Sequence, residues 1–321
     1  MSDPMSDPMS DAMSDAMSDA TTTPTTGSTT TTTTATGSTT TGRTISAFAA
    51  EEERRVLGLR PVLAPVHGRY GDHPHQVYDL WPAEGGRDDA PLVILLHGGY
   101  WRYDRMHLTP FAAYLAGQGL TTVLPGFRRS GGAGGYPETF DDIARIVDTL
   151  PAGRPYILAG HCSGGHLALW AGARALLPAD SPWHSAEPPT AILALAPLTD
   201  LQATIRDRLS EDAALQLLGG PEAAPERLPL VDPVTLLRGP GTTGVRTVLL
   251  HGAVDEEVPP GQFTDYAAVH RDLEVVVLPD TGHYTLIEPG APGARAVAEQ
   301  LNRLAAEFGP GQAVGSAGST T

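Results

Sequence analysis

Six short apolar runs, separated by stretches with helical periodicity, constrain the fold of this chain more than any other feature of its sequence. The runs are rich in Val, Ile and Leu and lie at 92–96, 121–124, 156–159, 191–195, 246–250 and 273–278. Short runs that are apolar throughout are typical of strands buried on both faces of a parallel sheet. The helix-like stretches lie at 108–118, 138–150, 164–177, 262–271 and 293–308. This alternation predicts one α/β domain: a mostly parallel, doubly wound sheet with helices on both faces.

The two ends of the chain differ in composition from its middle. Residues 1–20 repeat MSDP twice and then MSDA three times, residues 21–44 are mostly threonine, and the first aromatic residue is Phe48. Such segments cannot bury enough apolar surface to offset the entropy lost on ordering. We therefore expect a disordered tail over 1–44, a folded domain over 45–309 and a frayed tail over 310–321. The proline-rich stretch 200–240 interrupts the alternation, and we expect it to be an insertion or lid.

Charge and cysteine content argue against several classes of protein. The chain has 37 acidic and 21 basic residues, a net charge of −16. This charge repels phosphate backbones and anionic lipids, so we expect no nucleic-acid partner and no membrane partner. A single cysteine cannot build a disulfide framework or a cysteine-based metal cluster. With no apolar run of 18 residues and no basic start followed by an apolar segment, the sequence favours a cytoplasmic protein.

The first candidate functional segment follows the run 92–96 and reads His97-Gly98-Gly99-Tyr100-Trp101. In open α/β sheets, ligands bind beyond the carboxyl ends of the strands. Two adjacent glycines allow backbone N–H groups to turn towards a substrate oxygen, as an oxyanion hole requires. A tight turn that merely contains a histidine is the alternative, but the flanking aromatic residues favour a lined pocket.

The second segment, between the run 156–159 and a helix, reads Gly160-His161-Cys162-Ser163-Gly164-Gly165. A nucleophile at a sharp strand-to-helix turn needs small residues two positions before and two after it. Centring the pattern on Cys162 meets this requirement, whereas centring it on Ser163 places the bulky His161 at a small position. The helix that follows favours a thiolate. The spacing therefore predicts Cys162 as the nucleophile; an inert buried thiol is the alternative.

The third feature is a pair of residues near the carboxyl end of the chain. Asp255 follows the run 246–250, and His283 follows the run 273–278. The order nucleophile, acid, histidine is that of an α/β-hydrolase triad. We expect Asp255 to be the acid, with four rivals left open: Asp200, Glu256, Glu257 and Asp280.

These segments together resemble the kynurenine formamidase-like branch of the α/β-hydrolase fold. The resemblance rests on HGGYW with Arg102 after it, GHCSGGHLAL, GAVDEEVPPGQ and GHYTLIE, and it runs from about residue 90 to 290. It implies the α/β-hydrolase fold and a catalytic triad at Cys162, Asp255 and His283. It further implies an oxyanion hole formed by the backbone of Gly98 and Gly99 and by the N–H of Ser163. The chain departs from the family at the nucleophile, where Cys162 replaces a serine.

A cysteine nucleophile indicates an acyl-transfer enzyme that passes through a thioester. We expect hydrolysis of an ester, a thioester or an activated amide such as a formamide of a small molecule. Because amines attack thioesters more readily than water does, an acyltransferase or cyclase of specialised metabolism is one alternative. A non-catalytic binding protein that retains the fold is the other.

Weaker signals concern the substrate pocket and its ligands. We expect Tyr100, Trp101, Phe127 and Tyr284 to contact the acyl substrate. Arg128 and Arg129 either hold a substrate carboxylate or are exposed. The pairs His73/His75 and His161/His166 lack converging carboxylates, so we expect no metal. No nucleotide-binding motif follows a strand, so we expect no cofactor; a small-molecule acyl substrate is the expected partner, and a homodimer stays open.

Overall fold

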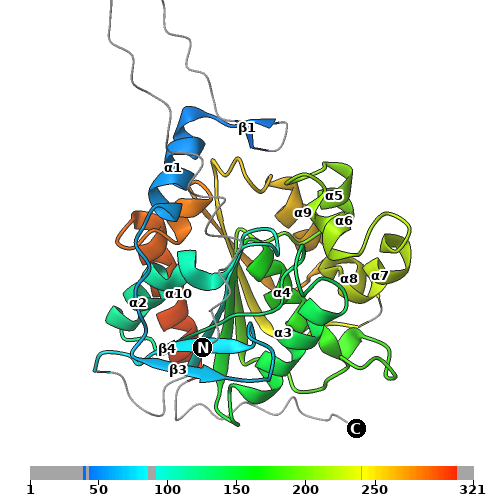
Figure 1. The fold of residues 1–321 in the computed structure, drawn as a ribbon, viewed down its shortest axis with the longest axis horizontal. Coiled ribbons are helices and arrows are strands. Elements are labelled where there is room, and N and C mark those ends of the chain that lie inside the picture. The colour runs from blue at the N-terminus through cyan, green and yellow to red at the C-terminus, as the bar shows by residue number, and fades with distance from the viewer. Residues whose placement is uncertain (1–38, 41–42, 86–91, 240, 309–321) are drawn as a thin grey trace, which may run out of the picture. The chain divides into compact units, whose positions relative to one another are not determined.

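The computed structural model describes residues 39–40, 43–85, 92–239 and 241–308 (Figure 1). The disordered tail expected over 1–44 lies mostly outside these residues, and the frayed tail expected over 310–321 lies wholly outside them. The described part of the first tail contains two short antiparallel strands, β1 (Thr39–Thr40) and β2 (Arg43–Thr44).

An eight-stranded sheet with the order β10-β9-β8-β7-β5-β6-β4-β3 organises the domain. Strands β5 to β10 run parallel, and only the edge strands β3 and β4 pair antiparallel. The predicted α/β fold class and its mostly parallel sheet are therefore confirmed. The strand bounds are β3 Val66–Arg69, β4 Val77–Trp81, β5 Leu92–Leu96, β6 Thr122–Pro125, β7 Tyr156–His161, β8 Ala191–Leu195, β9 Arg246–Gly252 and β10 Leu273–Leu278.

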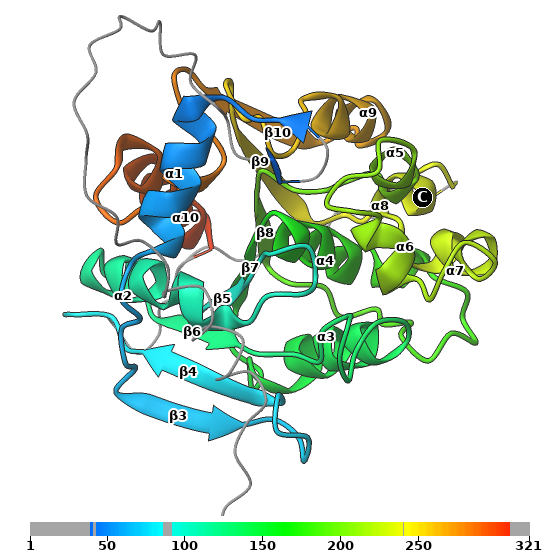
Figure 2. The ribbon, with the colours of Figure 1, turned by 45° about the horizontal axis from the view of Figure 1, so that its top comes forward.

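Helices cover both faces of this sheet (Figure 2). Helices α1 (Ala47–Leu57), α2 (Thr109–Gly117) and α10 (Pro292–Glu307) pack on one face, with buried residues that share one apolar cluster. Helices α3 (Glu138–Thr149), α4 (Ser163–Gly172) and α9 (Gly261–Val269) pack on the other face. In α10 the buried Val297, Leu301 and Leu304 recur at helical spacing, so a single apolar stripe fixes which side meets the sheet.

Every residue of the central strands β5, β7 and β8 is buried. This explains their apolar sequences, because helices cover both of their faces. The edge strand β10 instead has no fully buried residue. Since parallel strands end at the same edge of a sheet, the segments after β5, β7, β9 and β10 are brought together there.

Three parts of the fold add to the alternation of strands and helices that the sequence predicts: the strands β3 and β4, the helix α1 and the helices between β8 and β9. The edge strands β3 and β4 and the helix α1 lie before the first predicted strand. Helix α1 begins after Ser46, whose Oγ accepts a hydrogen bond from the N–H of Ala49 at 3.2 Å. The stretch between β8 and β9 contains four short helices: α5 (Leu201–Arg206), α6 (Ala213–Leu217), α7 (Ala224–Val231) and α8 (Pro233–Leu237). Within the described ranges, no helix is both long and apolar enough to cross a membrane.

Candidate active site

Cys162 occupies a strained turn between β7 and α4. Its φ is +56° and its ψ is −119°, a conformation that non-glycine residues rarely adopt. Its N–H donates to the carbonyl of Leu195 at 2.9 Å, and its own carbonyl accepts from the N–H of His166 at 3.1 Å. The neighbouring strand and the helix thus hold the turn from both sides, and the thiol lies at the amino end of α4, where the helix dipole favours negative charge.

Backbone crowding explains why the turn needs glycines on both sides of Cys162. A Cβ added to Gly160 would lie 2.2 Å from the carbonyl oxygen of Gly164, and one added to Gly164 would lie 2.2 Å from that of Leu96. A Cβ on Gly98 would lie 3.0 Å from the Cβ of Cys162. The HGG turn therefore packs directly against the nucleophile turn.

Ser163, the other nucleophile considered, has a structural contact. Its Oγ accepts a hydrogen bond from the N–H of Trp101 at 3.1 Å, and its side chain is fully buried. This bond ties the turn after β5 to the first residue of α4. It also supports the register of the motif that places Cys162, rather than Ser163, at the tip of the turn.

His283 and Asp255 lie as a hydrogen-bonded pair beside the thiol. The Nδ1 of His283 donates to Oδ2 of Asp255 at 2.7 Å. The other carboxylate oxygen accepts from the N–H groups of Glu257 and Val258, each at 2.8 Å. The imidazole also lies close enough to the side chain of Cys162 for the two to interact electrostatically. The structure therefore brings together the three residues that the sequence predicts as a triad.

Electrostatic interactions change the pKa values of His283 and Asp255. Burial by itself would lower the pKa of His283, but the negative charge of Asp255, followed by that of Cys162, raises it well above its ordinary value. Burial would raise the pKa of Asp255, but the charge and hydrogen bond of His283 lower it. The arrangement thus favours a protonated imidazole paired with the ionised carboxylate of Asp255.

Two further histidines support the site as neutral rings. Burial, followed by the charge of His283, lowers the pKa of His161 well below its ordinary value. Its Nε2 donates to the carbonyl of His283 at 3.1 Å, and the two ring centroids are 4.5 Å apart. Burial lowers the pKa of His166 to about 4, and both of its ring nitrogens are used, by Trp101 and Val231. His161 therefore holds the segment that contains His283, a contact that the sequence analysis missed.

A cavity of about 180 Å³ ends at the thiol. One side, here called the catalytic wall, is formed by Gly99, His161, Cys162 and His283. Four other lining residues, Glu53 and Leu57 from α1 and Ser210 and Glu211 from the segment between α5 and α6, are here called the outer wall. The remaining lining residues are Tyr100, Arg102, Tyr103, His107, Glu257 and Tyr284. A larger hollow of about 680 Å³ lies near the amino ends of β9 and β10 and contains none of the triad, so we place the active site at the smaller cavity.

The structure separates the four residues expected to contact substrate into two pairs. Tyr100 and Tyr284 line the cavity as expected. Trp101 and Phe127 instead lie in the core, fully or almost fully buried and away from the cavity lining. The φ of Trp101 is +62°, which turns its side chain into the core towards His166. The ring of Phe127 stacks on His97 at a centroid distance of 4.1 Å.

The outer wall includes residues that the sequence analysis did not identify. Glu53 and Leu57 come from α1, one helical turn apart on the same side of the helix. The only signals of this helix in the sequence were the capping Ser46, a run of good helix formers and Gly58 at its end. Nothing local indicated that it would reach Cys162 and His283, which lie more than a hundred positions later in the sequence.

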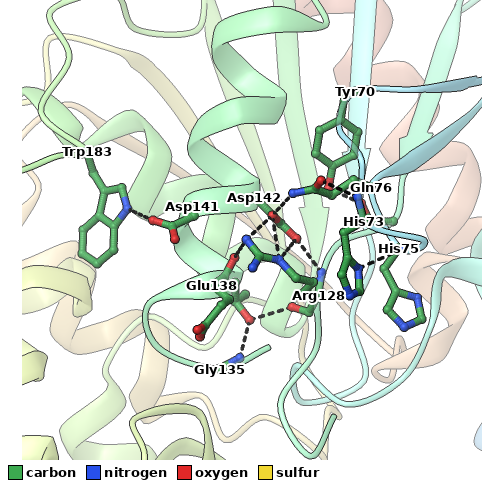
Figure 3. Close-up of polar contacts among 12 residues, drawn as sticks. Tyr70, His73, His75, Gln76, Arg128, Gly135, Glu138, Asp141, Asp142 and Trp183 are labelled. Atoms are coloured by element: carbon green, nitrogen blue, oxygen red, sulfur yellow. Dashed lines mark hydrogen bonds and ion pairs between the residues drawn. The ribbon is translucent and has the colours of Figure 1, made fainter. Parts of the chain in front are cut away.

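The other polar candidates have structural partners (Figure 3). The guanidinium of Arg128 pairs with the buried Asp142 at 2.7 Å, so it does not point into the cavity. The rings of His73 and His75 lie 5.3 Å apart, near the Gln76 that also contacts Asp142. Among the residues that the structure describes, no three or more His, Cys, Asp or Glu side chains form a group that could hold a metal ion.

Solved structures with a similar fold include two proteins named as esterases and one named as a putative thioesterase. A truncated carbohydrate esterase from gut microbiota has a TM-score of 0.62 and 14% identity, over 77% of this chain and 100% of that one. Esterase B from Lactobacillus rhamnosis has a TM-score of 0.61 and 20% identity, over 81% and 91%. A putative thioesterase from Silicibacter sp. has a TM-score of 0.54 and 23% identity, over 80% and 90%. Identities this low show a shared fold.

No curated protein shows significant sequence similarity to this chain. The model of the alpha/beta hydrolase family, in contrast, matches residues 93–297. The match covers most of the described domain and includes Cys162, Asp255 and His283. It confirms the expectation of an α/β-hydrolase-fold hydrolase, and it is a match to the family as a whole rather than to one of its branches. The chain therefore belongs to the alpha/beta hydrolase family.

Proposed function

We propose that this hydrolase is an acyl-transfer enzyme in which Cys162 attacks an ester, a thioester or an activated amide of a small molecule. One observation carries the proposal: Cys162 is held in the strained turn at the end of the cavity, in contact with a His283 that is itself bonded to Asp255. A buried thiol with only a packing role would not need this conformation or these partners.

The geometry supports a two-step reaction. The sulfur of Cys162 forms a bond to the substrate carbonyl carbon, and the negative charge moves to the carbonyl oxygen. The N–H groups of Gly98, Gly99 and Ser163 would stabilise this oxyanion; in comparable sites, the loss of one such donor costs about 3–4 kcal/mol. The imidazolium of His283 then protonates the leaving group as the carbon–heteroatom bond breaks, leaving an acyl thioester on Cys162.

The second step regenerates the enzyme. Neutral His283 accepts a proton from the incoming nucleophile, which attacks the thioester carbonyl, and the thiolate of Cys162 leaves. Asp255 fixes the tautomer of the imidazole through Nδ1. With water as the nucleophile, the product is an acid, and the overall reaction is hydrolysis.

The comparisons favour an ester or thioester as the acyl donor. The family is one of hydrolases, and the similar structures are named as esterases and a thioesterase. The resemblance to the kynurenine formamidase-like branch adds an aryl formamide to the candidates. Thiolate leaves a tetrahedral intermediate more easily than an amine does, so we expect the cysteine to act faster on esters and thioesters.

Transfer to an amine is the second candidate, and one observation favours it. Only 2% of the surface of Cys162 is exposed, and α1 forms part of the outer wall of its cavity. An acyl thioester in such an enclosed position meets less water, and amines are the better nucleophiles towards it. The acyltransferase and cyclase alternatives therefore depend on which nucleophile enters.

Intact-protein mass spectrometry tests the proposal. The wild type and the variants Cys162→Ala, Cys162→Ser and Ser163→Ala are incubated with p-nitrophenyl esters, acyl thioesters and an aryl formamide. We expect an acyl adduct on the wild type and on Ser163→Ala, and none on Cys162→Ala. Decay of the adduct with and without added amines then separates hydrolase from acyltransferase.

Two outcomes contradict the proposal. Equal labelling of the wild type and Cys162→Ala would move the nucleophile elsewhere. Wild-type turnover by Cys162→Ala would exclude covalent catalysis at this residue. A wild type with neither adduct nor turnover across the substrates would instead favour the non-catalytic binding protein.

A further inference from the structure

The charged residues that line the cavity are unequal in number. Three carboxylates, those of Glu53, Glu211 and Glu257, face a single guanidinium, that of Arg102. Next to them, the thiol of Cys162 and the carboxylate of Asp255 share the one imidazole of His283. The cavity therefore has an excess of negative charge even when His283 is protonated.

Arg102 already has partners on the protein. Its Nε donates to Oε1 of Gln216 at 2.6 Å, and its two terminal nitrogens donate to the carbonyls of Ser210 and Glu211 at 2.9 and 3.3 Å. These three bonds hold the segment between α5 and α6 in place. The guanidinium thus has a structural role and leaves the carboxylates of Glu53 and Glu257 uncompensated.

Glu53 and Glu257 reach the cavity from different parts of the chain. Glu53 lies on α1, and Glu257 lies in the loop after β9. Both are half-buried, and in the part of the chain that the structure describes neither forms an ion pair. Burial, followed by the charge of Glu257, raises the pKa of Glu53. Two carboxylates that repel each other across a small cavity are stabilised by a cation placed between them.

Tyrosine side chains complete the surroundings of these carboxylates. Tyr284 lies close to Glu53, and the hydroxyl of Tyr100 donates to the backbone carbonyl of Glu257 at 3.3 Å. Tyr103 also lines the cavity. Aromatic rings attract organic cations through their faces, most strongly where water is excluded. Rings combined with carboxylates suit an alkylammonium better than a small metal ion, which needs several converging oxygens.

We propose that this cavity selects acyl substrates that carry an alkylammonium group, bound between Glu53 and Glu257 and surrounded by Tyr100, Tyr103 and Tyr284. The proposal names a substrate class for the active site. It rests on the proposed function for the reaction, but the binding of the cation does not depend on that reaction. Glu53 and Glu257 are thus specificity-determining residues, and they have no part in the bond-breaking steps.

The single cysteine of the chain provides a direct test, because any thiol reagent reports on Cys162 alone. Methanethiosulfonates transfer their R–S group to a thiolate, forming a mixed disulfide and releasing methanesulfinate. We compare a trimethylammonium-ethyl reagent, a sulfonatoethyl reagent and the neutral methyl reagent by mass spectrometry. Each rate constant is divided by the rate of the same reagent with free 2-mercaptoethanol.

We expect the cationic reagent to react faster than the anionic one by a corrected factor well above ten. Glu53→Gln and Glu257→Gln should each reduce this factor about tenfold, as expected for removing one partly screened charge near the sulfur. The matched control is Glu51→Gln. Glu51 is on the same helix, pairs with Arg54 and is half-exposed, so its loss should leave the factor unchanged.

A second measurement concerns turnover. Acetylthiocholine and its uncharged isostere S-(3,3-dimethylbutyl) thioacetate have the same shape but differ in one charge. We expect kcat/KM to be at least tenfold higher for the cation. Glu53→Gln should lower the ratio of kcat/KM for the cation to kcat/KM for the isostere, because only the cation interacts with the charge of this carboxylate.

The outcomes separate this proposal from the proposed function. A corrected factor near one, or a factor that Glu53→Gln and Glu257→Gln leave unchanged, overturns the cation site. If no reagent reaches Cys162, the cavity is closed to ligands of this size, and the cation site is again overturned. A strong cationic preference in labelling, without turnover of either thioester, supports the cation site and counts against the acyl-transfer reaction.

Discussion

The two walls of the active-site cavity are built in different ways. On the catalytic wall, backbone contacts hold Cys162, and the glycines beside it admit no side chain. On the outer wall, α1 is attached by side chains: Glu52 accepts from the N–H of Thr285 at 2.7 Å, and Arg55 pairs with Glu288 at 2.6 Å. Backbone packing fixes the position of a reacting atom closely, whereas side-chain attachments can differ without a change of fold.

The two walls also meet in one segment. The residues that anchor α1, Thr285 and Glu288, follow directly after His283. A Cβ on Gly282 would lie 2.2 Å from Oε2 of Glu52, so the helix packs against the backbone next to His283. A change in the attachment of α1 can therefore reach the catalytic wall through this segment. The variants below test the difference between the walls, beginning with the largest expected effect.

Asp255→Asn should have the largest effect, because it acts inside the triad. An asparagine in this position favours the wrong imidazole tautomer, and we expect kcat to fall by about 10⁴-fold, as for the corresponding change in serine proteases. Loss of the carboxylate also removes the main cause of the raised pKa of His283. The imidazolium then loses its proton at lower pH, so the alkaline limb of the kcat profile should move to lower pH.

The control for this variant is Glu256→Gln at the neighbouring rival acid. Its carboxylate accepts from the N–H of Ser46 at 2.8 Å, a bond that a glutamine oxygen can keep. We expect Glu256→Gln to retain most of the activity across the pH profile. If Asp255→Asn were as active as this control, the acid of the triad would have to be assigned to another residue.

Gly164→Ala should have the next largest effect, on stability. The added Cβ would lie 2.2 Å from the Leu96 carbonyl oxygen and 2.6 Å from that of His97, and neither atom can move without shifting β5. We expect the free energy of unfolding to fall by about 3 kcal/mol or more, measured by urea denaturation.

Gly117→Ala is the matched control for this substitution. Gly117 ends α2, and a Cβ there meets no atom within 4 Å. Alanine should raise the free energy of unfolding by about 0.5–1 kcal/mol, because it restricts the unfolded chain. Equal effects of the two substitutions would show that the turn around Cys162 is less crowded than the contacts indicate.

The contrast between the walls also explains how much the sequence could predict. The strands β5 to β8 were visible because every one of their residues is buried, which favours runs of apolar residues. The strand β10 at the edge was visible from its valines and leucines, although none of its residues is fully buried. The turn around Cys162 was visible because backbone crowding leaves only glycine at 160 and 164. Asp255 and His283 could be found because they directly follow strands that end at the same edge of the sheet.

The parts that the sequence did not predict depend on distant contacts. The edge strands β3 and β4 are short and only partly buried, so they lack a continuous apolar run. Glu52 is buried and bonds to Thr285, which lies 233 positions later in the sequence. Trp101 was expected in the pocket as an aromatic neighbour of the glycine turn, but its ring lies in the core and bonds to the distant His166. Composition and local spacing are what the sequence shows directly, and neither reveals contacts between residues that are far apart along the chain.

Glu52→Ala tests the buried attachment of α1. The substitution leaves the N–H of Thr285 without its acceptor, and we expect a loss of about 1–3 kcal/mol in the free energy of unfolding. We also expect a fall in kcat/KM, since Thr285 lies two residues after His283. Glu52→Gln keeps an acceptor oxygen in place and should recover most of both losses. Equal losses for Ala and Gln would show that the charge, rather than the hydrogen bond, stabilises this contact.

Arg55→Ala should have the smallest effect, although its contact with Glu288 is geometrically good. The Nε and one terminal nitrogen of Arg55 donate to the two carboxylate oxygens of Glu288 at 2.6 and 2.7 Å, but 43% of the Arg55 side chain is exposed. Water and salt screen such a pair, so its loss should cost at most about 1 kcal/mol and less at high ionic strength. A double-mutant cycle with Glu288→Ala, measured by urea denaturation at low and high salt, isolates the pair energy. A coupling free energy larger than the loss caused by Glu52→Ala would mean that the surface pair is the main attachment of α1. The attachment should then weaken as salt is added. With the small coupling that we expect, the buried contact beside His283 would hold the outer wall, and catalysis should keep its dependence on α1 at any ionic strength.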